Sequence, residues 1–298
     1  MSDSTNPLSA LSDAIAAAVA LAGRSVVAVN ARHRTPSSGI IWRAGVVVTA
    51  EHALKRDEEI TVTLADNRTA PATLAGRDPG SDLAVLKLDT GNNPAAEAAD
   101  AASLQVGNMA LALGRRGENG IAASLGVVSA LSGAWRTWRG AHLDLFIRPD
   151  TSLYPGFSGG PLVDIHGRIV GINTSALTRN AGVTVPASTV ERVTNELLSK
   201  GHIARGYLGV GLHPVQLPGG RGGLIVLSIE PNGPAANGGI LIGDVLTDLD
   251  GKPVNDTDDV QAHLGPDRVG QSLRASVSRG GTAMELTIVA GERPRGGQ

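Results

Sequence analysis

The sequence YPGFSGGPLVD, residues 154–164, places Ser158 between an aromatic residue and two glycines. Glycines around a serine remove Cβ atoms where a substrate backbone would approach the hydroxyl group. A turn before a strand, however, uses the same glycine, serine and proline residues for backbone reasons alone. The stretch is therefore compatible with an exposed nucleophile and with an ordinary bend, and residues elsewhere in the chain have to decide between them.

Short apolar strands are expected on both sides of this stretch. From residue 25 to residue 172, runs rich in Val, Ile and Leu alternate with Gly, Pro, Asn or Asp. Turn signals recur roughly every ten residues, which is typical of antiparallel sandwiches and barrels. The chain is therefore predicted to be mainly β, and its length of 298 residues favours two domains.

A helix is predicted to close the first domain. Residues 188–191 have the pattern of a capping box, the apolar residues that follow recur at helical spacing, and Gly201 ends the pattern. We expect this first domain to cover residues 25–201. A linker, a second domain and a flexible tail are predicted at residues 202–206, 207–290 and 291–298.

Residues 1–24 predict an N-terminal amphipathic helix. Its apolar side chains recur at spacings of three and four: Leu8, Leu11, Ile15 and Val19. The apolar run over residues 14–22 lacks the preceding basic residues of a secretory signal, and it is too short to span a bilayer. We therefore expect a cytoplasmic protein, or a periplasmic or otherwise extracytoplasmic one if a signal was removed.

Composition excludes several classes of site. The formal net charge is -2, so no general positive field would draw the chain to nucleic acid or to an anionic membrane. The chain has no cysteine, which excludes disulfides, thiolate zinc sites and cysteine nucleophiles. No metal ion or organic cofactor is implied.

Three polar residues occur in the order His, Asp, Ser. His52 follows the apolar run VVVTA, Asp82 precedes the apolar run LAVLKL, and Ser158 lies in GFSGG. Each has an ordinary alternative: a half-buried histidine at a strand end, a turn or cap aspartate, and a turn serine. A serine nucleophile needs a base that takes its proton and an acid that orients this base, so the three together indicate a hydrolase.

The chain resembles the HtrA (Deg) family of trypsin-like serine proteases that carry a PDZ domain. The resemblance implies two six-stranded β-barrels, with His52 as general base, Asp82 as its orienting acid and Ser158 as nucleophile. It also implies an oxyanion hole formed by the N–H groups of Gly156 and Ser158, although Gly156 could be a plain turn glycine. The matching stretches are SSGIIW, VVVTAEHAL, TVTLADNR, GRDPGSDLAVLKLD, LGVVSAL, GFSGGPLVD, GRIVGIN, GVTVPASTVERV and GYLGV.

Two departures from the family pattern concern the active site. Phe157 stands immediately before the serine, where the family usually has Asn, and TAEHAL replaces a commoner sequence with Asn before the histidine. Phe157 could support the loop differently or hold the oxyanion hole collapsed at rest.

The substrate pocket is predicted to accept small or aliphatic P1 side chains such as Val, Ala or Leu. A pocket for Lys or Arg needs an acid about six residues before the nucleophile, where this chain has Ser152. The residues expected to line the pocket are Ser152, Leu153, Gly182, Val183 and Thr184.

A compact loop between two predicted strands alternates Trp and Arg. Its residues are Trp135, Arg136, Trp138 and Arg139. A surface loop that packs on its own domain, a regulatory contact and binding of single-stranded nucleic acid are three interpretations of this pattern, and the last is disfavoured by the neutral chain.

The second domain resembles a PDZ domain. GYLGV could expose consecutive backbone N–H groups to a terminal carboxylate, and PNGPAANGGILIGDVLTDLDGKPV resembles the PGSPAxxAGLxxGDxIxxxNG run of bacterial PDZ domains. The alternative is a strand that merely leaves a linker. The residues expected to bind peptide are Tyr207, Leu208, Gly209 and Val210.

These features predict an ATP-independent serine endopeptidase that acts in protein quality control. Its expected partners are unfolded or misfolded polypeptides, with C-terminal peptides at the PDZ domain and no nucleic acid. The family resemblance suggests a homotrimer, but the N-terminal aromatic residues of the family's trimer contacts are lacking before Trp42. A catalytically silent peptide-binding chaperone or scaffold is the alternative. An α/β-hydrolase esterase is disfavoured, since its order is Ser, acid, His.

Overall fold

The computed structural model describes residues 6–32, 35–99, 101–117, 120–178, 182–217 and 219–293. Contacts divide the chain into two compact units, Met1–Ile203 and Ala204–Gln298. The division falls inside the predicted linker at residues 202–206.

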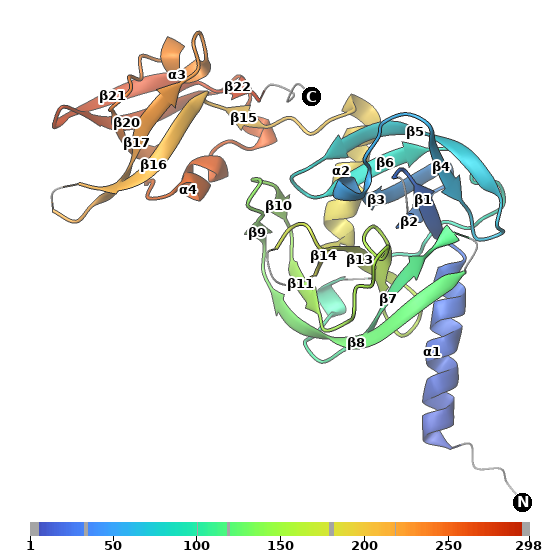
Figure 1. Ribbon diagram of the computed structural model, residues 1–298. Coiled ribbons are helices and arrows are strands. Elements are labelled where there is room, and N and C mark those ends of the chain that lie inside the picture. The colour runs from blue at the N-terminus through green and yellow to red at the C-terminus, as the bar shows by residue number, and fades with distance from the viewer. Residues whose placement is uncertain are drawn as a thin grey trace, which may run out of the picture. The chain divides into compact units, whose positions relative to one another are not determined.

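Two closed barrels, each of six antiparallel strands, form the first unit (Figure 1). The first barrel has the strand order β1-β2-β3-β6-β5-β4 and the second has the order β11-β14-β13-β12-β7-β8. The first barrel consists of β1 (Val26–Asn30), β2 (Ser37–Arg43), β3 (Val46–Ala50), β4 (Ile60–Thr63), β5 (Thr69–Asp78) and β6 (Leu83–Lys87). The second consists of β7 (Met109–Arg115), β8 (Ile121–Ser132), β11 (Phe146–Pro149), β12 (Pro161–Val163), β13 (Ile169–Thr174) and β14 (Val183–Pro186). A short hairpin, β9 (Trp135–Arg136) and β10 (His142–Leu143), connects β8 to β11.

Several strands are buried on both faces. In β1, Val27 and Val29 belong to the core inside the first barrel, whereas Val26 belongs to a core shared with strands of the second barrel. Successive side chains of a strand point to opposite faces, and β-branched residues suit such positions. This explains why the strands read as continuous apolar runs and not as an apolar and polar alternation.

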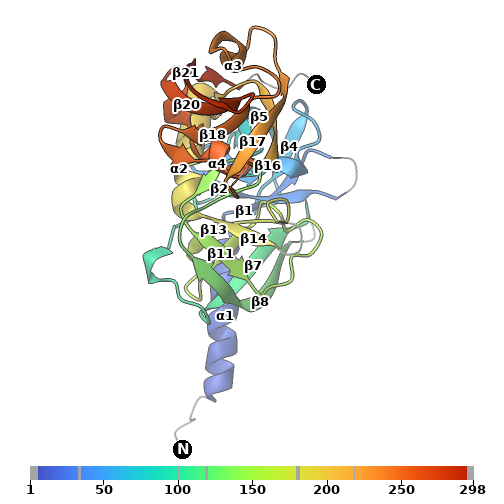
Figure 2. The same cartoon turned by 90° about the vertical axis from the view of Figure 1, so that its left-hand side faces the viewer.

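Helix α1 (Pro7–Gly23) lies within the predicted range of residues 1–24, of which residues 1–5 lie outside the described residues. The Asn6 side chain accepts a hydrogen bond from the Leu8 N–H at the start of the helix. Ala18 and Ala22 are buried, whereas the first half of the helix is exposed and projects beyond the second barrel in both views (Figures 1 and 2).

Helix α2 (Ala187–Lys200) ends at Gly201 as predicted, but the predicted capping box at residues 188–191 is wrong. Pro186 is the N-cap residue and makes no side-chain cap hydrogen bond. The Ser188 hydroxyl donates instead to Asp144 at 2.8 Å. The Glu191 carboxylate accepts from the Trp42 indole N–H at 2.7 Å, so tertiary partners outcompete the local cap.

A five-stranded path of antiparallel strands forms the second unit, with its own apolar core. In order, the path contains β16 (Val210–Gln216), β17 (Gly222–Ile229), β18 (Val245–Leu249), β20 (Ser272–Arg279) and β21 (Thr282–Val289). The remaining elements are β15 (Gly206–Tyr207), α3 (Pro234–Asn237), β19 (Lys252–Pro253), α4 (Thr257–Ala262) and β22 (Gly291–Glu292). Strand β16 lies at the edge of the path, and on its outer side it pairs with no other described strand, as a peptide that adds a strand would require.

The predicted linker and tail are both shorter than expected. Gly206, assigned to the linker, and Gly291 with Glu292, assigned to the tail, pair as β15 and β22. This ladder joins the beginning and the end of the second unit. Each of its strands has only two residues, which is too short for hydrophobic periodicity to predict a strand. Residues 294–298 of the predicted tail lie outside the described residues.

The described helices include none with the length and apolar character needed to span a bilayer.

Candidate active site

The first barrel carries both the predicted base and the predicted acid. His52 lies in a short 3-10 turn, Glu51–Ala53, directly after β3, and Asp82 directly precedes β6. Strands β3 and β6 are neighbours in the barrel, which brings the two residues together. The His52 Nδ1 atom lies 2.7 Å from Asp82 Oδ2, and the His52 backbone N–H donates to Asp82 Oδ1 at 2.8 Å.

Asp82 is held more tightly than a surface aspartate. Its side chain is only 1% exposed, and Oδ2 also accepts a hydrogen bond from the Thr174 hydroxyl of β13. Its φ of 55° lies in the left-handed region, which a non-glycine residue adopts at some energetic cost. With Asp82 accepting at Nδ1, the neutral His52 ring carries its proton there and leaves Nε2 able to accept one.

Ser158 lies in a turn between β11 and β12. The glycine at position 159 has a φ of 85°, and a Cβ atom there would lie 2.2 Å from the Ser38 carbonyl oxygen. Glycine is therefore required after the serine by both conformation and space. The Ser158 Oγ atom lies 3.4 Å from Ser175 Oγ, and no hydrogen bond to His52 is formed among the described residues. Catalytic hydrogen bonds are often long without substrate and tighten when it binds.

Two backbone N–H groups at this turn have the character of an oxyanion hole. Gly156 has a φ of 94°, a conformation that favours glycine. Over the described part of the chain, the N–H groups of Gly156 and Ser158 donate to no protein acceptor. Unpaired donors next to a nucleophile can stabilise the negative oxygen of a tetrahedral intermediate.

Ser38 of β2 supports this turn, and the sequence analysis gave it no role. Its hydroxyl donates to the Gly156 carbonyl at 2.6 Å, and its backbone N–H donates to the Ser158 carbonyl at 3.2 Å. The hydroxyl also accepts from the Arg115 backbone N–H at 2.9 Å. Ser38 thus fixes the carbonyl groups on both sides of Phe157. Its motif SSGIIW was the only available signal.

Arg115, whose backbone N–H donates to the Ser38 hydroxyl, also contacts the end of α1. Its guanidinium donates to the carbonyl groups of Gly23 and Val26 at 3.0 and 2.7 Å. The residue is 6% exposed, and burial lowers the pKa of its guanidinium. Cations near a helix C-terminus stabilise its unpaired carbonyl groups.

Phe157, between the two candidate oxyanion donors in the sequence, belongs to an apolar core cluster of the second barrel. Its side chain is fully buried, and its ring stacks edge-on against Tyr154 with 5.4 Å between centroids. A Cβ atom at Gly114 would lie 2.6 Å from this ring. Phe157 therefore acts as a core residue that anchors the serine turn.

The predicted pocket residues are only partly brought together. Leu153 lies directly against Gly182, where an added Cβ atom would lie 2.2 Å from Leu153 Cδ1. Val183 and Thr184 are buried in β14, and the Thr184 hydroxyl donates to Asn173 at 2.8 Å. Ser152 is exposed, and its N–H donates to Ser124 Oγ. Among the predicted pocket residues, the Leu153 side chain therefore packs on Gly182 and fills the space beside this glycine.

The second unit offers a separate site at the start of β16. Leu208 is buried in the core of this unit, and Gly209 has a φ of 73°. Within the described residues, the N–H groups of Leu208 and Gly209 donate to no protein acceptor. The Tyr207 hydroxyl donates to Glu230 at 2.6 Å, which raises the pKa of the tyrosine. Consecutive unpaired N–H groups beside an open strand edge suit a terminal carboxylate.

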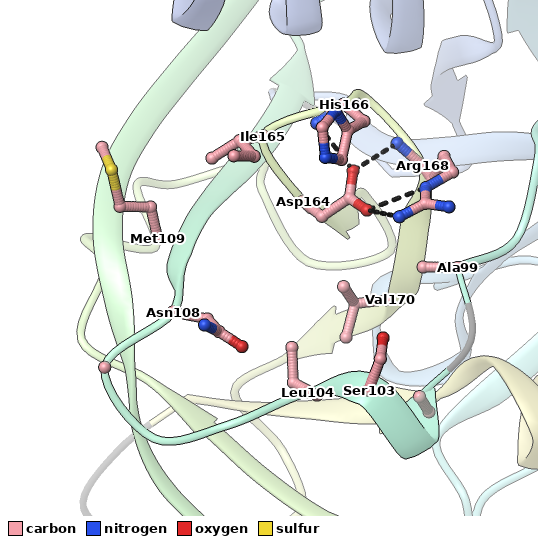
Figure 3. A pocket seen from close by; sticks show the side chains of 12 residues that line it. Ala99, Ser103, Leu104, Asn108, Met109, Asp164, Ile165, His166, Arg168 and Val170 are labelled. Carbon is pink, nitrogen blue, oxygen red and sulfur yellow. Dashed lines mark hydrogen bonds and ion pairs between the residues drawn. The ribbon is translucent and has the colours of Figure 1, made fainter. Parts of the chain in front are cut away.

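A separate cavity of about 420 Å³ lies beside the second barrel, next to the starts of β7 and β13, and does not include the candidate triad (Figure 3). Leu104, Met109, Ile165 and Val170 give it an apolar lining, and the Asp164 carboxylate on its rim is paired with Arg168 at 2.8 Å. Among the described residues, no cluster of His, Asp and Glu side chains is arranged to hold a metal ion.

Comparisons with known proteins agree with this architecture. A trypsin-like peptidase domain matches residues 37–172, and a PDZ domain matches residues 206–289. Probable periplasmic serine endoproteases of the DegP-like type from Halomonas elongata and Pseudomonas putida are 32% and 34% identical, over 88% and 87% of this chain. These matches cover 57% and 56% of the two relatives, so the chain spans a little over half of their length.

Solved structures match over nearly the whole of both chains. The HtrA-type protease AlgW with a tripeptide is 31% identical with a TM-score of 0.74, and the match covers 95% of this chain and 98% of that one. A serine endoprotease from Yersinia pestis has a TM-score of 0.76 at 29% identity, with the same coverage. The chain belongs to the HtrA (Deg) family of trypsin-like serine proteases with a C-terminal PDZ domain.

Proposed function

We propose that the protein is an ATP-independent serine endopeptidase that cleaves unfolded or misfolded polypeptides. The observation that carries the proposal is the His52–Asp82 hydrogen bond of 2.7 Å beside a serine turn in which the Gly156 and Ser158 N–H groups find no acceptor among the described residues. A silent scaffold would need neither an oriented histidine nor vacant donors at the serine. The nucleophile, base and acid are Ser158, His52 and Asp82.

The proposed reaction follows from these positions. His52 Nε2 takes the proton of Ser158 as its Oγ attacks the substrate carbonyl carbon, and the N–H groups of Gly156 and Ser158 stabilise the resulting oxyanion. The imidazolium, stabilised by Asp82, then gives its proton to the leaving amine and the peptide bond breaks. In the second half, His52 takes a proton from a water molecule that attacks the acyl carbon, the ester bond to Ser158 Oγ breaks, and His52 gives this proton to Oγ.

We propose a preference for small aliphatic P1 residues and peptide capture by the PDZ domain. The contact of Leu153 with Gly182 supports a shallow P1 pocket, with Ser152 in place of an acid. The N–H groups of Leu208 and Gly209 beside strand β16, which donate to no acceptor in the described part of this unit, support capture of C-terminal peptides, with Tyr207 and Val210 flanking them. The captured peptides would be substrates or activators.

A homotrimer outside the cytoplasm is the proposed setting. The relatives from Halomonas elongata and Pseudomonas putida are named as probable periplasmic endoproteases, which favours the extracytoplasmic alternative over the cytoplasm. Leu8, Leu11 and Leu21 of α1 are 74%, 43% and 55% exposed, which supports a contact of α1 with another copy. Sedimentation equilibrium of the wild type and of a Leu8→Ser, Leu11→Ser variant tests the trimer, because a monomeric wild type would contradict it.

Labelling with a fluorophosphonate, followed by intact-mass analysis, tests the catalytic proposal. Wild type is compared with Ser158→Ala and His52→Ala, each with and without unfolded protein or a hydrophobic C-terminal peptide. We expect one adduct on wild type and none on Ser158→Ala. Labelling that requires the peptide would indicate a switched enzyme, whereas no labelling under any condition would leave the peptide-binding scaffold.

A further inference from the structure

The β9–β10 hairpin lies beside the candidate active site, although the reaction proposed above does not use it. Its Thr137 hydroxyl donates to the Gly80 carbonyl at 2.8 Å, and the Arg139 guanidinium donates to the Pro79 carbonyl at 3.3 Å. Both acceptors belong to the short turn that leads into Asp82. The tip of the hairpin is thus fixed within a few residues of the catalytic acid.

Trp138 at this tip also contacts the segment next to the nucleophile. Its indole N–H donates to the Ala176 carbonyl at 3.5 Å. The preceding residue, Ser175, lies with its Oγ atom 3.4 Å from Ser158 Oγ. The Trp138 indole is therefore hydrogen-bonded to the residue next to Ser175, whose side chain lies against the candidate nucleophile.

The ring is exposed yet held in place. Trp138 is 60% exposed, and the Arg139 guanidinium lies 4.4 Å from its ring centroid. Trp135 of the same hairpin instead packs against Phe146 with 5.3 Å between ring centroids, which anchors the base of the hairpin in the barrel. An exposed indole on an anchored hairpin is an apolar surface that loses little conformational entropy when a ligand covers it.

We propose that Trp138 forms a substrate subsite for an apolar or aromatic side chain two to four residues N-terminal to P1. Gly182, six residues after Ala176 in the sequence, lies against Leu153 of the proposed P1 pocket. A substrate whose P1 side chain enters this pocket would extend its preceding residues toward Ala176. Extended chain rises about 3.3 Å per residue, so these positions lie about 7–13 Å from P1.

Trp138 would then set specificity and not chemistry. An apolar side chain that covers the ring removes both surfaces from water, and aromatic pairs add to this effect. We expect about a tenfold gain in kcat/KM for peptides with Trp, Phe or Leu at one of these positions over the same peptides with Gly or Asp. The proposal rests on the proteolytic function proposed above.

The test uses full-length wild type, Trp138→Ala and Trp138→Phe with a pooled peptide library. The library has Val at P1 and varied residues two to four positions before it, and mass spectrometry measures the relative kcat/KM of each peptide. We expect Trp138→Ala to lose the preference and Trp138→Phe to retain most of it. Equal loss for all peptides, or an unchanged preference in Trp138→Ala, overturns the subsite.

The fluorophosphonate separates this proposal from the catalytic one. The reagent reaches Ser158 without occupying distant subsites, so its labelling rate should be the same in wild type and Trp138→Ala. A slower rate in Trp138→Ala would mean that the hairpin shapes the triad, which contradicts a subsite role. If wild type itself fails to label, the proteolytic function has failed, independently of Trp138. Trp135→Leu, which loosens the base of the hairpin, is the matched control for hairpin damage.

Discussion

Ser38 is a single residue that fixes the backbone of the serine turn without touching the reacting atoms. Its hydroxyl donates to the Gly156 carbonyl, and its backbone N–H donates to the Ser158 carbonyl. The orientation of these carbonyl groups constrains the neighbouring peptide planes, which include the N–H groups of the candidate oxyanion hole. Ser38 is therefore a positioning residue.

The variant Ser38→Ala should lower kcat by about tenfold to a hundredfold with a smaller change in KM, because small misplacements of catalytic donors have effects of this size. Steady-state kinetics on a peptide substrate measures the changes in kcat and in KM separately. Ser37→Ala is the matched control, since the Ser37 hydroxyl is buried in the same strand without a hydrogen-bond partner in the described structure. Equal kinetics for the two variants would show that Ser38 does not position the turn.

Phe157 is the residue at which the serine turn meets the core of the second barrel. It is fully buried, and the ring fits the space left by Gly114. We expect Phe157→Ala to reduce the free energy of unfolding by about 3–5 kcal/mol, as for other buried aromatic residues. Chemical denaturation measures this loss. Phe157→Leu should lose less, and a loss as small as that of a surface substitution would contradict a core role.

At the residue scale, the sequence predicts the candidate site residues that lie within local motifs. His52 and Asp82 stand next to recognisable strands, and the structure brings their side chains into contact. Ser38 and Thr174 were missed, because their hydroxyl groups gain a role only through strands that are distant in the chain. Burial of Thr184 in the barrel wall was likewise invisible to motif spacing.

At the scale of elements, helix α2 connects the two barrels. Its Glu191 carboxylate accepts from the Trp42 indole at 2.7 Å and from the Arg43 guanidinium at 2.5 Å, both at the end of β2 in the first barrel. Hydrogen bonds from Arg43 and Trp42 lower the pKa of this carboxyl group. The helix follows β14 of the second barrel, so this contact spans the barrels.

Glu191→Ala should therefore destabilise the first unit by about 1 kcal/mol, since the hydrogen bond to Trp42 is charge-assisted but the ion pair is half exposed. Thermal unfolding measures the change. Glu196→Ala on the same helix is the control, because Glu196 pairs with Lys200 one turn away at 3.4 Å. Such a pair contributes only about 0.2–0.5 kcal/mol. Equal losses would mean that α2 does not tie the barrels through Glu191.

The elements that sequence reasoning misplaced depend on tertiary contacts. Periodicity located α2 and its end at Gly201, but Ser188 pairs with Asp144 and not with its own helix. The strands β9, β10, β15 and β22 have two residues each, too few for any periodic signal. Long strands and long helices are therefore predictable here, whereas caps and two-residue ladders are not.

At the scale of the whole molecule, each of the two units has its own apolar core. The core of the second unit contains residues of that unit alone. We therefore expect calorimetry to resolve two unfolding transitions, each near two-state. A variant in the core of the PDZ unit should move one transition and leave the other in place. The Asp244–Arg279 pair offers a way to identify the PDZ transition by its pH dependence.

Asp244 is 1% exposed and accepts two hydrogen bonds from the Arg279 guanidinium, at 2.8 and 2.7 Å. These bonds and the Leu241 N–H lower the pKa of the Asp244 carboxyl group. A group whose folded pKa is depressed contributes stability that is present above its unfolded pKa, about 3.9, and is lost as pH falls through the folded pKa. The PDZ transition should therefore fall in temperature as the solution is acidified below about pH 4.

Asp244→Asn should flatten this acid dependence of the PDZ transition, because the titrating group is gone, while lowering its Tm at neutral pH by leaving Arg279 without its ionic partner. Asp248→Asn is the control, since Asp248 of β18, four residues after Asp244, pairs at 2.6 Å with Arg221, an arginine that is 57% exposed. Calorimetry between pH 3 and pH 7 measures how the Tm of the PDZ transition depends on pH in each variant. An unchanged slope in Asp244→Asn would mean that other carboxylates govern acid unfolding of this unit, and a shift of both transitions would contradict their independence.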